Sequence, residues 1–403
     1  MKEIILEIFN LQGLDRGLAK CWVTEGEIYF KLKDSHQASC PRCGVLTDKR
    51  HARGRWRKVY HGSAFGRRVW VLLRKSRYLC GSCSKPFTEE LSWILPRQRK
   101  TVEAEQQIIH SLRGQSFKSV SEKEGISYGV SKRVLKRCLN PEQVRWPESG
   151  EISLGIDAHS FRGAKLVNTV TEVRSRRPLT ILPDNRKETV KRFLRNIPAE
   201  TKERVREVCI DMESMLLAAV EEELPQASVV VDHFHLIQDA NVRMDEARRI
   251  EQDAVKQEIP RKIFLVGKEK LNPKQKKRVE TYCQKYPSLK EFYWMKEALR
   301  SLYRLKSKTA AEKRLKDLIQ MAFLSDDAAM VQWGRTLKRW SRYILNFFDH
   351  RTTNAYTEGI HTKIKMIKRV SFGFRNVQVY VRKVLLCLWP LAFIFPWLPH
   401  YSS

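Results

Sequence analysis

Short runs that mix apolar and polar residues dominate the first 95 positions of the chain. The clearest are residues 27–32 (EIYFKL) and 68–73 (RVWVLL), which are rich in β-branched and aromatic side chains. Successive side chains of a strand point to opposite faces, so such short alternating runs predict β-strands. Residues 1–95 are therefore predicted to form a module of short strands.

Helical spacing replaces this pattern over residues 98–140. Thr101 is a candidate cap for a first helix, and a second short helix is expected through residues 117–121. Gly125 would make the following turn, and Ser127 would cap a third helix that carries Val130, Val134 and Leu135. Three such helices resemble a helix-turn-helix, although many small helical hairpins look the same. In that case the last helix would read the major groove through Tyr128, Lys132, Arg133 and Lys136.

The remainder of the chain alternates strands with helices and then becomes helical. Residues 150–237 contain three closely spaced strand candidates and then strands that alternate with helices, which predicts an α/β domain with a mixed sheet. Residues 238–345 read as charged helix, with breaks near Pro260, Pro273 and Pro287. Residues 350–385 return to mixed character, and residues 346–403 are assigned to the same domain as 150–237. The predicted fold class is multidomain α+β.

The net charge of the chain indicates the kind of binding partner. The 403 residues include 76 Lys and Arg against 45 Asp and Glu, a formal net charge of +31, and 42% are hydrophobic. A chain that basic repels itself unless it meets a polyanion, so nucleic acid is the leading partner and an anionic membrane surface the second. The start of the chain does not resemble a signal peptide. Residues 384–399 are too short and too interrupted by prolines to span a bilayer, so we expect a buried segment and a cytoplasmic protein.

Basic residues are concentrated in two places. Residues 51–100 hold 13 Lys and Arg against two acids, and residues 351–400 hold eight against one. In the first stretch Trp56, Tyr60 and Trp70 lie among the cations, which suits phosphate contacts and stacking. A basic hairpin that is merely solvated is the alternative. The candidate DNA-binding cations here are Arg53, Arg55, Lys58, Arg67 and Arg68.

Four cysteines have the spacing of a zinc site. Cys40 and Cys43 form one C-x2-C pair, and Cys80 and Cys83 form another after 36 intervening residues. Each pair can turn two thiolates toward one Zn²⁺, and two pairs complete a tetrahedral site. Four unrelated buried cysteines are the alternative, which the paired spacing disfavours. Because four protein ligands leave no open position, the predicted zinc is structural, as fits a reducing compartment.

Carboxylates follow three apolar runs of the α/β region. Asp157 follows residues 154–156, Asp211 follows 208–210 and Asp232 follows 229–231. A carboxylate at the end of a buried strand is held rigidly at a cleft, and several together can bind two Mg²⁺ ions about 3.5–4 Å apart. A strand-end cap is the alternative for any one of them. Glu358 opens a basic segment that contains Lys365, Lys368, Arg369 and Arg375. His233 and His235 follow Asp232, and we expect them to be hydrogen-bonded core groups rather than metal ligands.

Together these residues resemble the ISL3 family of bacterial insertion-sequence transposases, within the DDE, RNase H-like superfamily. The resemblance covers nearly the whole chain. It rests on the cysteine pairs followed by residues 85–89 (KPFTE), on 155–157 (GID), 232–236 (DHFHL), 354–359 (NAYTEG), 364–365 (IK) and 373–376 (GFRN). The chain departs from the family at Ala158, where an acidic residue is usual, and at His361, where Asn is usual.

The resemblance implies a particular architecture and site. It implies a zinc module over 1–95, a helix-turn-helix over 98–140, and an RNase H-like domain over 150–237 and 346–403 that is interrupted by a helical insertion over 238–345. In that fold three strands form a meander, a helix crosses over, and the fourth strand lies beside the first. Asp211 ends the fourth strand and Asp232 the fifth, so Asp157, Asp211 and Glu358 are the predicted ligands of Mg²⁺ or Mn²⁺. We expect Asp232 and His235 to organise the junction with the insertion.

The function implied is that of a DNA transposase. It would bind the terminal inverted repeats of an insertion sequence, cleave there and join the freed 3′-OH to target DNA, as a homodimer or higher oligomer on double-stranded DNA. An inactive zinc-containing DNA-binding regulator is the alternative from another class, and an RNase H-like nuclease without strand joining is the third. A metal-dependent cleavage assay on the element's ends separates them.

Overall fold

The computed structural model describes residues 7–9, 11 and 16–394, and the chain forms two compact units. The first unit contains the residues up to Asn140 together with those from Met366 onward, and the second spans Pro141–Lys365. The sequence had assigned residues 346–403 to one domain with 150–237. In the structure the residues from Met366 onward belong to the first compact unit, where the last helices pack on the helices that follow the β module.

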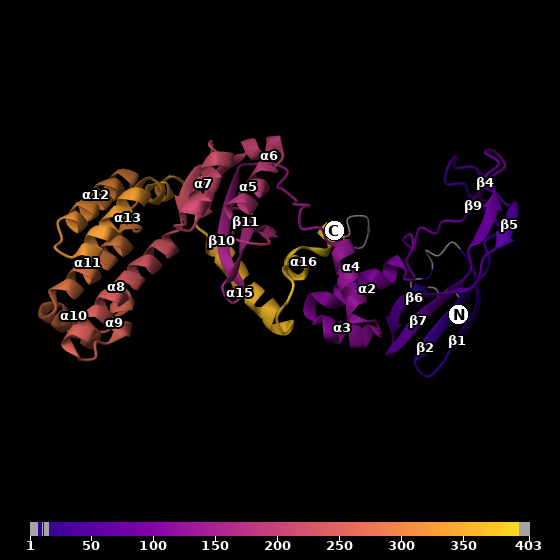
Figure 1. Cartoon of the computed structure of the whole chain (residues 1–403), viewed down its shortest axis with the longest axis horizontal. Coiled ribbons are helices and arrows are strands. Elements are labelled where there is room, and N and C mark those ends of the chain that lie inside the picture. Colours follow the sequence, from indigo (N-terminus) through magenta and orange to yellow (C-terminus); the bar gives the residue numbers. More distant parts are fainter. Residues whose placement is uncertain (1–6, 10, 12–15, 395–403) are drawn as a thin grey trace. The chain divides into compact units, whose positions relative to one another are not determined.

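The β module of the first unit consists of small sheets (Figure 1). A four-stranded sheet has the order β1-β2-β7-β6, in which β2 and β7 are parallel and the other neighbours antiparallel. Alternate residues Ile28, Phe30 and Leu32 of β2 are buried, as the period of two predicts. The strands of this module are β1 (Leu18–Val23), β2 (Glu27–Leu32), β3 (Ala38–Ser39), β4 (Leu46–Thr47), β5 (Arg50–Arg53), β6 (Arg57–Ala64), β7 (Arg67–Leu73), β8 (Ser76–Leu79) and β9 (Pro86–Thr88).

Three helices follow, α2 (Val102–Gly114), α3 (Phe117–Glu124) and α4 (Tyr128–Cys138). Thr101 caps α2 by accepting from the Ala104 amide, and Gly125 ends α3 in the left-handed region with φ 61°. Ser127 stands at the cap position of α4, but its side chain makes no capping hydrogen bond, so that part of the prediction was wrong. The buried Glu124 carboxylate accepts hydrogen bonds from Tyr60 and Ser63 of β6, which joins the helices to the sheet.

The C-terminal helices complete this group of helices. Helix α16 (Val377–Leu388) packs against α2 and α4, and the Nζ of its buried Lys383 donates to the Gln115 carbonyl at 2.9 Å. The short α17 (Leu391–Ile394) follows. The segment predicted to be buried is buried at most positions from Val384 to Ile394, and its last five residues lie outside the described part of the chain.

The second unit is built on a five-stranded mixed sheet of order β12-β11-β10-β13-β14. The first three strands of this sheet, β10, β11 and β12, form an antiparallel meander. Strands β13 and β14 run parallel to β10. A mixed sheet is what the residue pattern predicts, and this strand order is the one that the family resemblance implies. The strands are β10 (Ile152–Arg162), β11 (Lys165–Glu172), β12 (Arg177–Leu182), β13 (Val205–Ile210) and β14 (Ser228–Val231).

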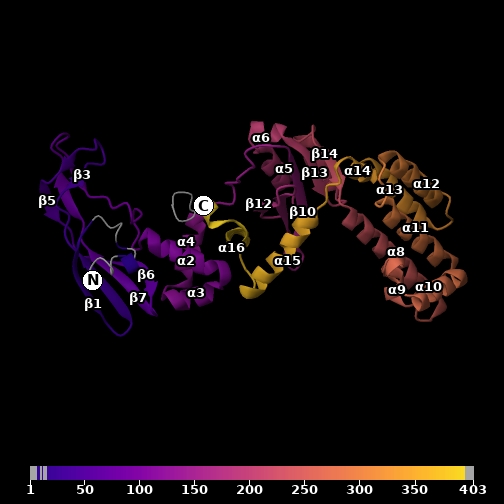
Figure 2. The same ribbon diagram turned by 180° about the vertical axis from the view of Figure 1, so that it is seen from behind.

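The two faces of this sheet carry different partners. Apolar side chains such as Leu154, Ile156 and Val170 pack with Val190 and Leu194 of α5 in one core. The opposite face carries Asp157, Thr169 and Thr171, where the side chains of α15 make contact. Figures 1 and 2 show α15 crossing the sheet. The helices on the two faces are α5 (Lys187–Arg195), α6 (Ala199–Glu203), α7 (Ser214–Glu223) and α15 (Ala355–Val370).

A helical region separates β14 from α15 and shares the core of the sheet. Its buried residues include Leu299, Trp333 and Leu337. Pro273 and Pro287 each occupy the first position of a helix, where proline lacks only an amide that no helical bond would use. The helices are α8 (His233–Val255), α9 (Arg261–Leu265), η1 (Lys268–Lys270), α10 (Pro273–Lys285), α11 (Pro287–Leu302), α12 (Lys308–Phe323), α13 (Ala328–Leu345) and α14 (Phe347–His350). Over the described residues, no helix is long and apolar enough to cross a membrane.

Candidate metal centres and nucleic-acid interface

The four predicted zinc ligands meet in one cluster. The sulfur atoms of Cys40, Cys43, Cys80 and Cys83 all lie within 4.8 Å of one another. The Cys40–Cys83 and Cys43–Cys80 sulfur pairs are 3.7 and 3.5 Å apart, close to the roughly 3.8 Å edge of a tetrahedron with Zn–S bonds of about 2.3 Å. Backbone amides of Cys83 and Ser82 donate toward Cys80 and lower the pKa of its thiol to about 6. Cys80 therefore favours the thiolate, the form that binds zinc. The Val45 amide lowers the pKa of Cys43, but the Cys80 sulfur and burial outweigh it and raise that pKa to about 11.

A second cluster of ligand atoms lies on the polar face of the mixed sheet. One group contains Asp157, Asp211 and His235, and another contains Asp232, His235 and Glu358, each with ligand atoms within 4.8 Å. Asp157 lies within β10, which continues to Arg162, while Asp211 and Asp232 follow the carboxyl ends of β13 and β14. Because β10, β13 and β14 are adjacent and parallel, their carboxylates reach the same edge.

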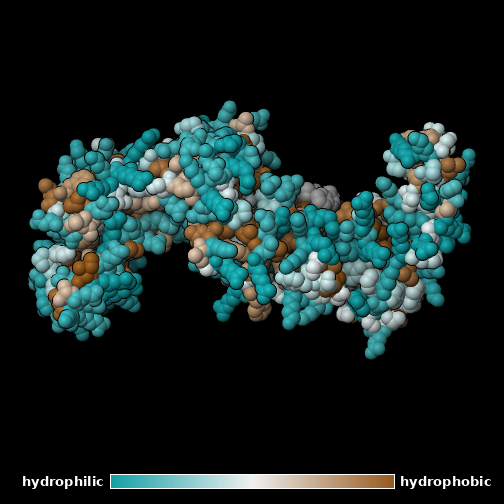
Figure 3. Space-filling view, viewed as in Figure 1, coloured by the Kyte–Doolittle hydropathy of each residue, from teal (hydrophilic) through white to brown (hydrophobic). Residues whose placement is uncertain are grey.

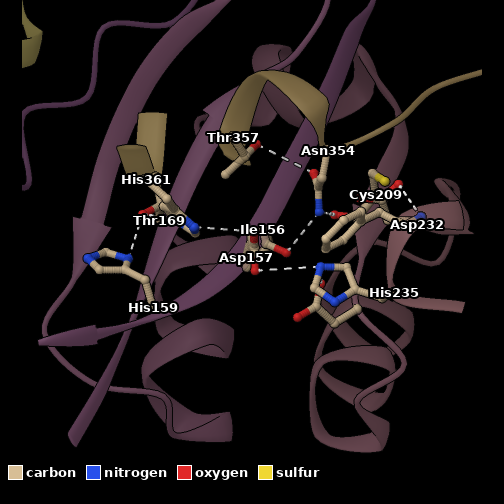
Figure 4. Close-up of polar contacts among 12 residues, drawn as sticks. Ile156, Asp157, His159, Thr169, Cys209, Asp232, His235, Asn354, Thr357 and His361 are labelled. Atoms are coloured by element: carbon tan, nitrogen blue, oxygen red, sulfur yellow. Dashed lines mark hydrogen bonds and ion pairs between the residues drawn. The ribbon is translucent and has the colours of Figure 1, made fainter. Parts of the chain in front are cut away.

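Two small features bring Glu358 from the far end of the chain to this edge. Asn354, which is fully buried, directs its side-chain amide at the carbonyls of Ile156 and Cys209, both at 3.4 Å (Figure 4). A Cβ on Gly155 would stand only 2.5 Å from Asn354 Oδ1 and 2.7 Å from Thr357 Oγ1. Gly155 thus leaves room for α15 to lie directly on β10, which places Glu358 in the first turn beside the aspartates.

His235 joins the two groups. Its Nε2 lies 2.8 Å from Asp211 Oδ1 and 4.0 Å from Asp157 Oδ1. His235 Nε2 and Asp211 Oδ1 therefore partner each other as an ion pair. Asp232 caps α8 by accepting from the Phe234 amide, and its other oxygen has no partner. Two buried ligand atoms, Asp232 Oδ2 and Glu358 Oε1, have no hydrogen-bond partner among the described residues.

The electrostatics of this cluster fit a cation. Burial and then the neighbouring Asp211 raise the pKa of Asp157 to about 8. Burial and then Asp232 also raise the pKa of Glu358. Burial lowers the pKa of His235, but Asp211 and Asp157 outweigh it and raise that pKa to about 9. Several carboxylates held close together repel one another when no cation is bound. Hard divalent cations such as Mg²⁺ or Mn²⁺ prefer oxygen ligands and would relieve this repulsion.

His361 contacts the second carboxylate oxygen of Asp157, the one that does not face His235. Its Nδ1 lies 3.4 Å from Asp157 Oδ2, and its Nε2 is 3.0 Å from Thr169 Oγ1, which in turn is 3.0 Å from His159 Nδ1 (Figure 4). Burial, with Lys365 nearby, lowers the pKa of His361 to about 4, so the ring is neutral at physiological pH. His361 therefore presents a neutral hydrogen-bonding ring to Asp157.

The structure brings the predicted Asp157 and Asp211 together and places Glu358 with Asp232 and His235. His235, which the sequence predicts to be a hydrogen-bonded core group, is the residue that both groups share. Its position in the first turn of α8, directly after a strand-end aspartate, was the available signal. Asn354 and Gly155 were quoted only as parts of motifs, because their roles depend on two segments that lie about two hundred residues apart.

Several cations predicted to bind DNA have partners within the β module. Lys58 and Arg68 both pair with Glu27, at 3.2 and 3.0 Å, and Lys58 also lies 4.0 Å from the centre of the Trp70 ring. Arg53 approaches Asp34 at 4.0 Å, and Arg67 donates to the Glu25 carbonyl. Arg55 is exposed. The mixture of cations and aromatics is thus used in part to hold the module together.

The last helix of the helix-turn-helix presents a basic surface. Tyr128, Arg133 and Lys136 are exposed on α4, and Lys132 lies 4.2 Å from the centre of the Tyr128 ring. Arg137 of the same helix is instead bound to Glu105 of α2. In the C-terminal segment Lys365, Arg369 and Arg375 are exposed, and Lys368 is half-buried.

A thiolate cluster and a helix-turn-helix in one unit, with a carboxylate cluster on a mixed sheet in the other, define a modular DNA-binding protein. Comparison with known proteins agrees. A family profile described as "Transposase" matches residues 154–384, one described as "zinc-finger of transposase IS204/IS1001/IS1096/IS1165" matches 36–83, and one described as "Helix-turn-helix domain of transposase family ISL3" matches 89–138. The chain belongs to the ISL3 family of transposases, as the sequence analysis had concluded.

Curated relatives match as well. The transposase for insertion sequence element IS1001 of Bordetella parapertussis is 26% identical over 356 residues, which cover 86% of this chain and 87% of the relative. The transposase for insertion sequence element IS1557 of Mycobacterium tuberculosis is 24% identical over 265 residues, which cover 58% of this chain and 60% of the relative.

Proposed function

We propose that this chain is an active DDE transposase with an RNase H-like catalytic domain. It would cleave DNA at the terminal inverted repeats of its insertion sequence and join the freed 3′-OH to target DNA. The observation that carries this proposal is the meeting of Asp157, Asp211, Asp232, His235 and Glu358 in one cluster, where the buried oxygens Asp232 Oδ2 and Glu358 Oε1 have no partner among the described residues. Divalent cations would satisfy those atoms and relieve the repulsion among the carboxylates.

Three carboxylates have the proposed role of holding Mg²⁺ or Mn²⁺: Asp157, Asp211 and Glu358. Bound there, a pair of such ions supplies an activated oxygen nucleophile and stabilises the leaving oxygen of an in-line displacement. The strand order supports Asp211 over Asp232, because β13 is the neighbour of β10 while β14 is one strand farther away. Asp232 also caps α8, and His235 contacts Asp211, so both residues would position the ligands.

The other residues of the site orient these carboxylates. Asn354 fixes the start of α15 against β10 and β13, and so sets where Glu358 stands. The neutral His361 ring, held by Thr169, would keep one Asp157 oxygen in place. These residues act on the geometry of the ligands rather than on the reacting atoms.

The first unit would supply DNA recognition. A structural Zn²⁺ bound by Cys40, Cys43, Cys80 and Cys83 would hold the β module, and Tyr128, Lys132, Arg133 and Lys136 on α4 would contact the terminal repeats in the major groove. Pairing on the DNA as a homodimer or higher oligomer would bring two element ends together. The family and the basic charge support action on bacterial chromosomal DNA in the cytoplasm.

The test uses the full chain and a duplex carrying the terminal inverted repeats that flank this coding sequence. We expect strand cleavage and joining to a target plasmid with Mg²⁺ or Mn²⁺ and none with a chelator. Glu358→Gln should remove both reactions, while Glu200→Gln, an exposed carboxylate on α6, should leave them intact.

Other outcomes identify the alternatives. Specific end binding without cleavage in either metal would contradict the proposal and indicate a DNA-binding regulator. Cleavage without any strand joining would indicate an RNase H-like nuclease.

A further inference from the structure

The turn between α15 and α16 holds an aromatic residue where helices normally use glycine. The Phe372 amide donates to the Arg369 carbonyl at 3.1 Å, and the Gly373 amide donates to the Lys368 carbonyl at 2.9 Å. This pair of hydrogen bonds is the Schellman ending of a helix, which requires a left-handed residue at its first position after the cap. Phe372 takes that conformation with φ 55°, although its side chain makes the conformation unfavourable.

The fold gains nothing from the Phe372 ring. Its side chain is 91% exposed, the highest value among the large hydrophobic residues of the described chain. Phe374, two residues later, behaves in the opposite way, because its ring packs edge-on against Tyr380 of α16 with 5.3 Å between centroids. Phe374 therefore anchors the turn, while Phe372 is held in a strained conformation and directed into solvent. Phe372 lowers the stability of the fold through its left-handed backbone and through its exposed ring. This combination points to a ligand outside the chain.

The surroundings of this ring match a polyanion with apolar interior surfaces. Met366 and Val370, on the last two turns of α15, are 65% and 47% exposed. Arg369 and Arg375 flank the turn and are exposed, and the chain contains no Asp or Glu after Glu358. Figure 3 shows hydrophobic side chains among hydrophilic ones at the lower end of the region where Figure 1 places α15.

The β6–β7 hairpin contains a second phenylalanine with a left-handed backbone, and it can be compared with Phe372. Phe65 also precedes a glycine and has φ 52° in the β6–β7 hairpin, next to Arg67. Its ring, however, contacts Phe9 with 6.2 Å between centroids, so that aromatic has a partner within the protein. Phe372 has the strain and the flanking cations, and its ring is the more exposed of the two.

We propose that Phe372 is a DNA-stacking wedge that enters a base step of the bound duplex while Arg369 and Arg375 hold the flanking phosphates. Apolar side chains inserted in this way unstack bases, and flanking cations supply the sequence-independent part of the affinity. This inference rests on the proposed function, since it assigns a contact with the DNA on which the transposase acts.

The experiment uses the full chain and duplexes that carry the terminal repeat, with 2-aminopurine placed at successive positions. Binding of the unaltered protein should raise the fluorescence at one or two adjacent positions, because unstacking relieves quenching. Phe372→Ala and Phe372→Gly should abolish this increase and weaken binding about tenfold, whereas Phe372→Trp should keep both. Phe372→Gly should unfold at the same temperature or higher, since glycine suits the left-handed position.

The controls separate this proposal from the catalytic one. Leu324→Ala removes an apolar side chain that is 84% exposed and should change neither fluorescence nor affinity. Asp157→Asn should keep the fluorescence increase while losing cleavage. No increase at any position with a protein that still cleaves would overturn the wedge and leave the transposase assignment standing. Loss of binding to anionic phospholipid vesicles in Phe372→Ala, with DNA behaviour unchanged, would assign the ring to a membrane surface instead. A protein that neither binds nor cleaves the ends would overturn both proposals.

Discussion

The two ligand clusters of this protein are built in opposite ways. The thiolate cluster comes from two C-x2-C pairs, each of which turns two sulfur atoms toward one point within four residues. The carboxylate cluster draws on residues from 157 to 358 and exists only because three strands and one helix meet. Local turns define the first site, whereas the topology of a whole unit defines the second. Substitutions should therefore disturb the first through folding of a small module and the second through geometry at long range.

The largest effect should come from the thiolate cluster. Cys80→Ser should release zinc and unfold the β module, since binding energy in small zinc modules is folding energy, about 10–16 kcal/mol in zinc-finger peptides. Metal analysis together with circular dichroism checks this. Cys21→Ser, which changes an exposed cysteine outside the cluster, is the matched control and should keep the zinc. Absence of zinc in protein purified without chelator would contradict the assignment.

The carboxylate cluster should lose chemistry without losing its fold. Asp157→Asn, Asp211→Asn and Glu358→Gln should each lower cleavage and strand joining by at least about a thousandfold, because each removes a proposed ligand of the catalytic ions. Binding to the terminal repeats, measured by mobility shift, should persist, since the helix-turn-helix lies in the other unit. Full activity in any of the three would remove that residue from the ligand set.

Substitution of Asp232 tests whether Asp211 or Asp232 is the second metal ligand of the carboxylate cluster. Asp232→Asn keeps a capping side chain for α8, so we expect only about a tenfold loss of cleavage rate, through placement of His235 and the helical region. Parallel cleavage assays and thermal unfolding of Asp211→Asn and Asp232→Asn would measure the difference. If Asp232→Asn proves as inactive as Asp157→Asn while Asp211→Asn stays active, Asp232 is the second metal ligand.

Gly155 tests the long-range assembly directly. Gly155→Ala would push a methyl group to within 2.8 Å of the Asn354, Thr357 and Thr171 oxygens, so α15 must shift. Overpacking of this kind costs about 1–3 kcal/mol, and we expect lower activity with zinc content unchanged. Gly359→Ala has open space around the new methyl group and should be neutral or slightly stabilising. Equal unfolding temperatures and equal activities for the two variants would mean that the approach of α15 to β10 is not tight.

The smallest effect concerns pH. The pKa of Asp157 is raised to about 8 and that of His235 to about 9, both above their unfolded values. Groups with raised pKa values contribute stability below their unfolded pKa and lose it as pH rises through the folded value. Without Mg²⁺, the second unit should therefore unfold at a lower temperature near pH 9 than near pH 6. Added Mg²⁺ should stabilise more at the higher pH, because protons no longer compete for the carboxylates.

Scanning calorimetry over this pH range checks the last prediction, with Asp157→Asn as the control, which should show a weaker pH dependence. The thiolate cluster should behave in the opposite way, because the pKa of Cys80 is lowered to about 6 and acid removes the thiolate. A metal-free second unit that becomes more stable toward pH 9 would contradict the raised pKa of Asp157.

Much of this protein follows from the sequence because the relevant interactions are local. The cysteine spacing predicts the thiolate cluster, Thr101 and Gly125 mark helix ends, and the runs of apolar residues predict the strands. Such features depend on a few neighbouring residues, whose backbone preferences and side-chain reach can be evaluated without the remainder of the chain.

Tertiary structure decided what depends on packing between distant segments. It placed His235 between both groups of carboxylates, brought Asn354 and Glu358 onto β10 over Gly155, and packed α16 on α2 and α4. It also paired Lys58 and Arg68 with Glu27, so that cations predicted to bind DNA take part in the fold. Which side chains meet across such separations depends on strand order, helix placement and the space left by one glycine, and no local pattern in the sequence encodes them.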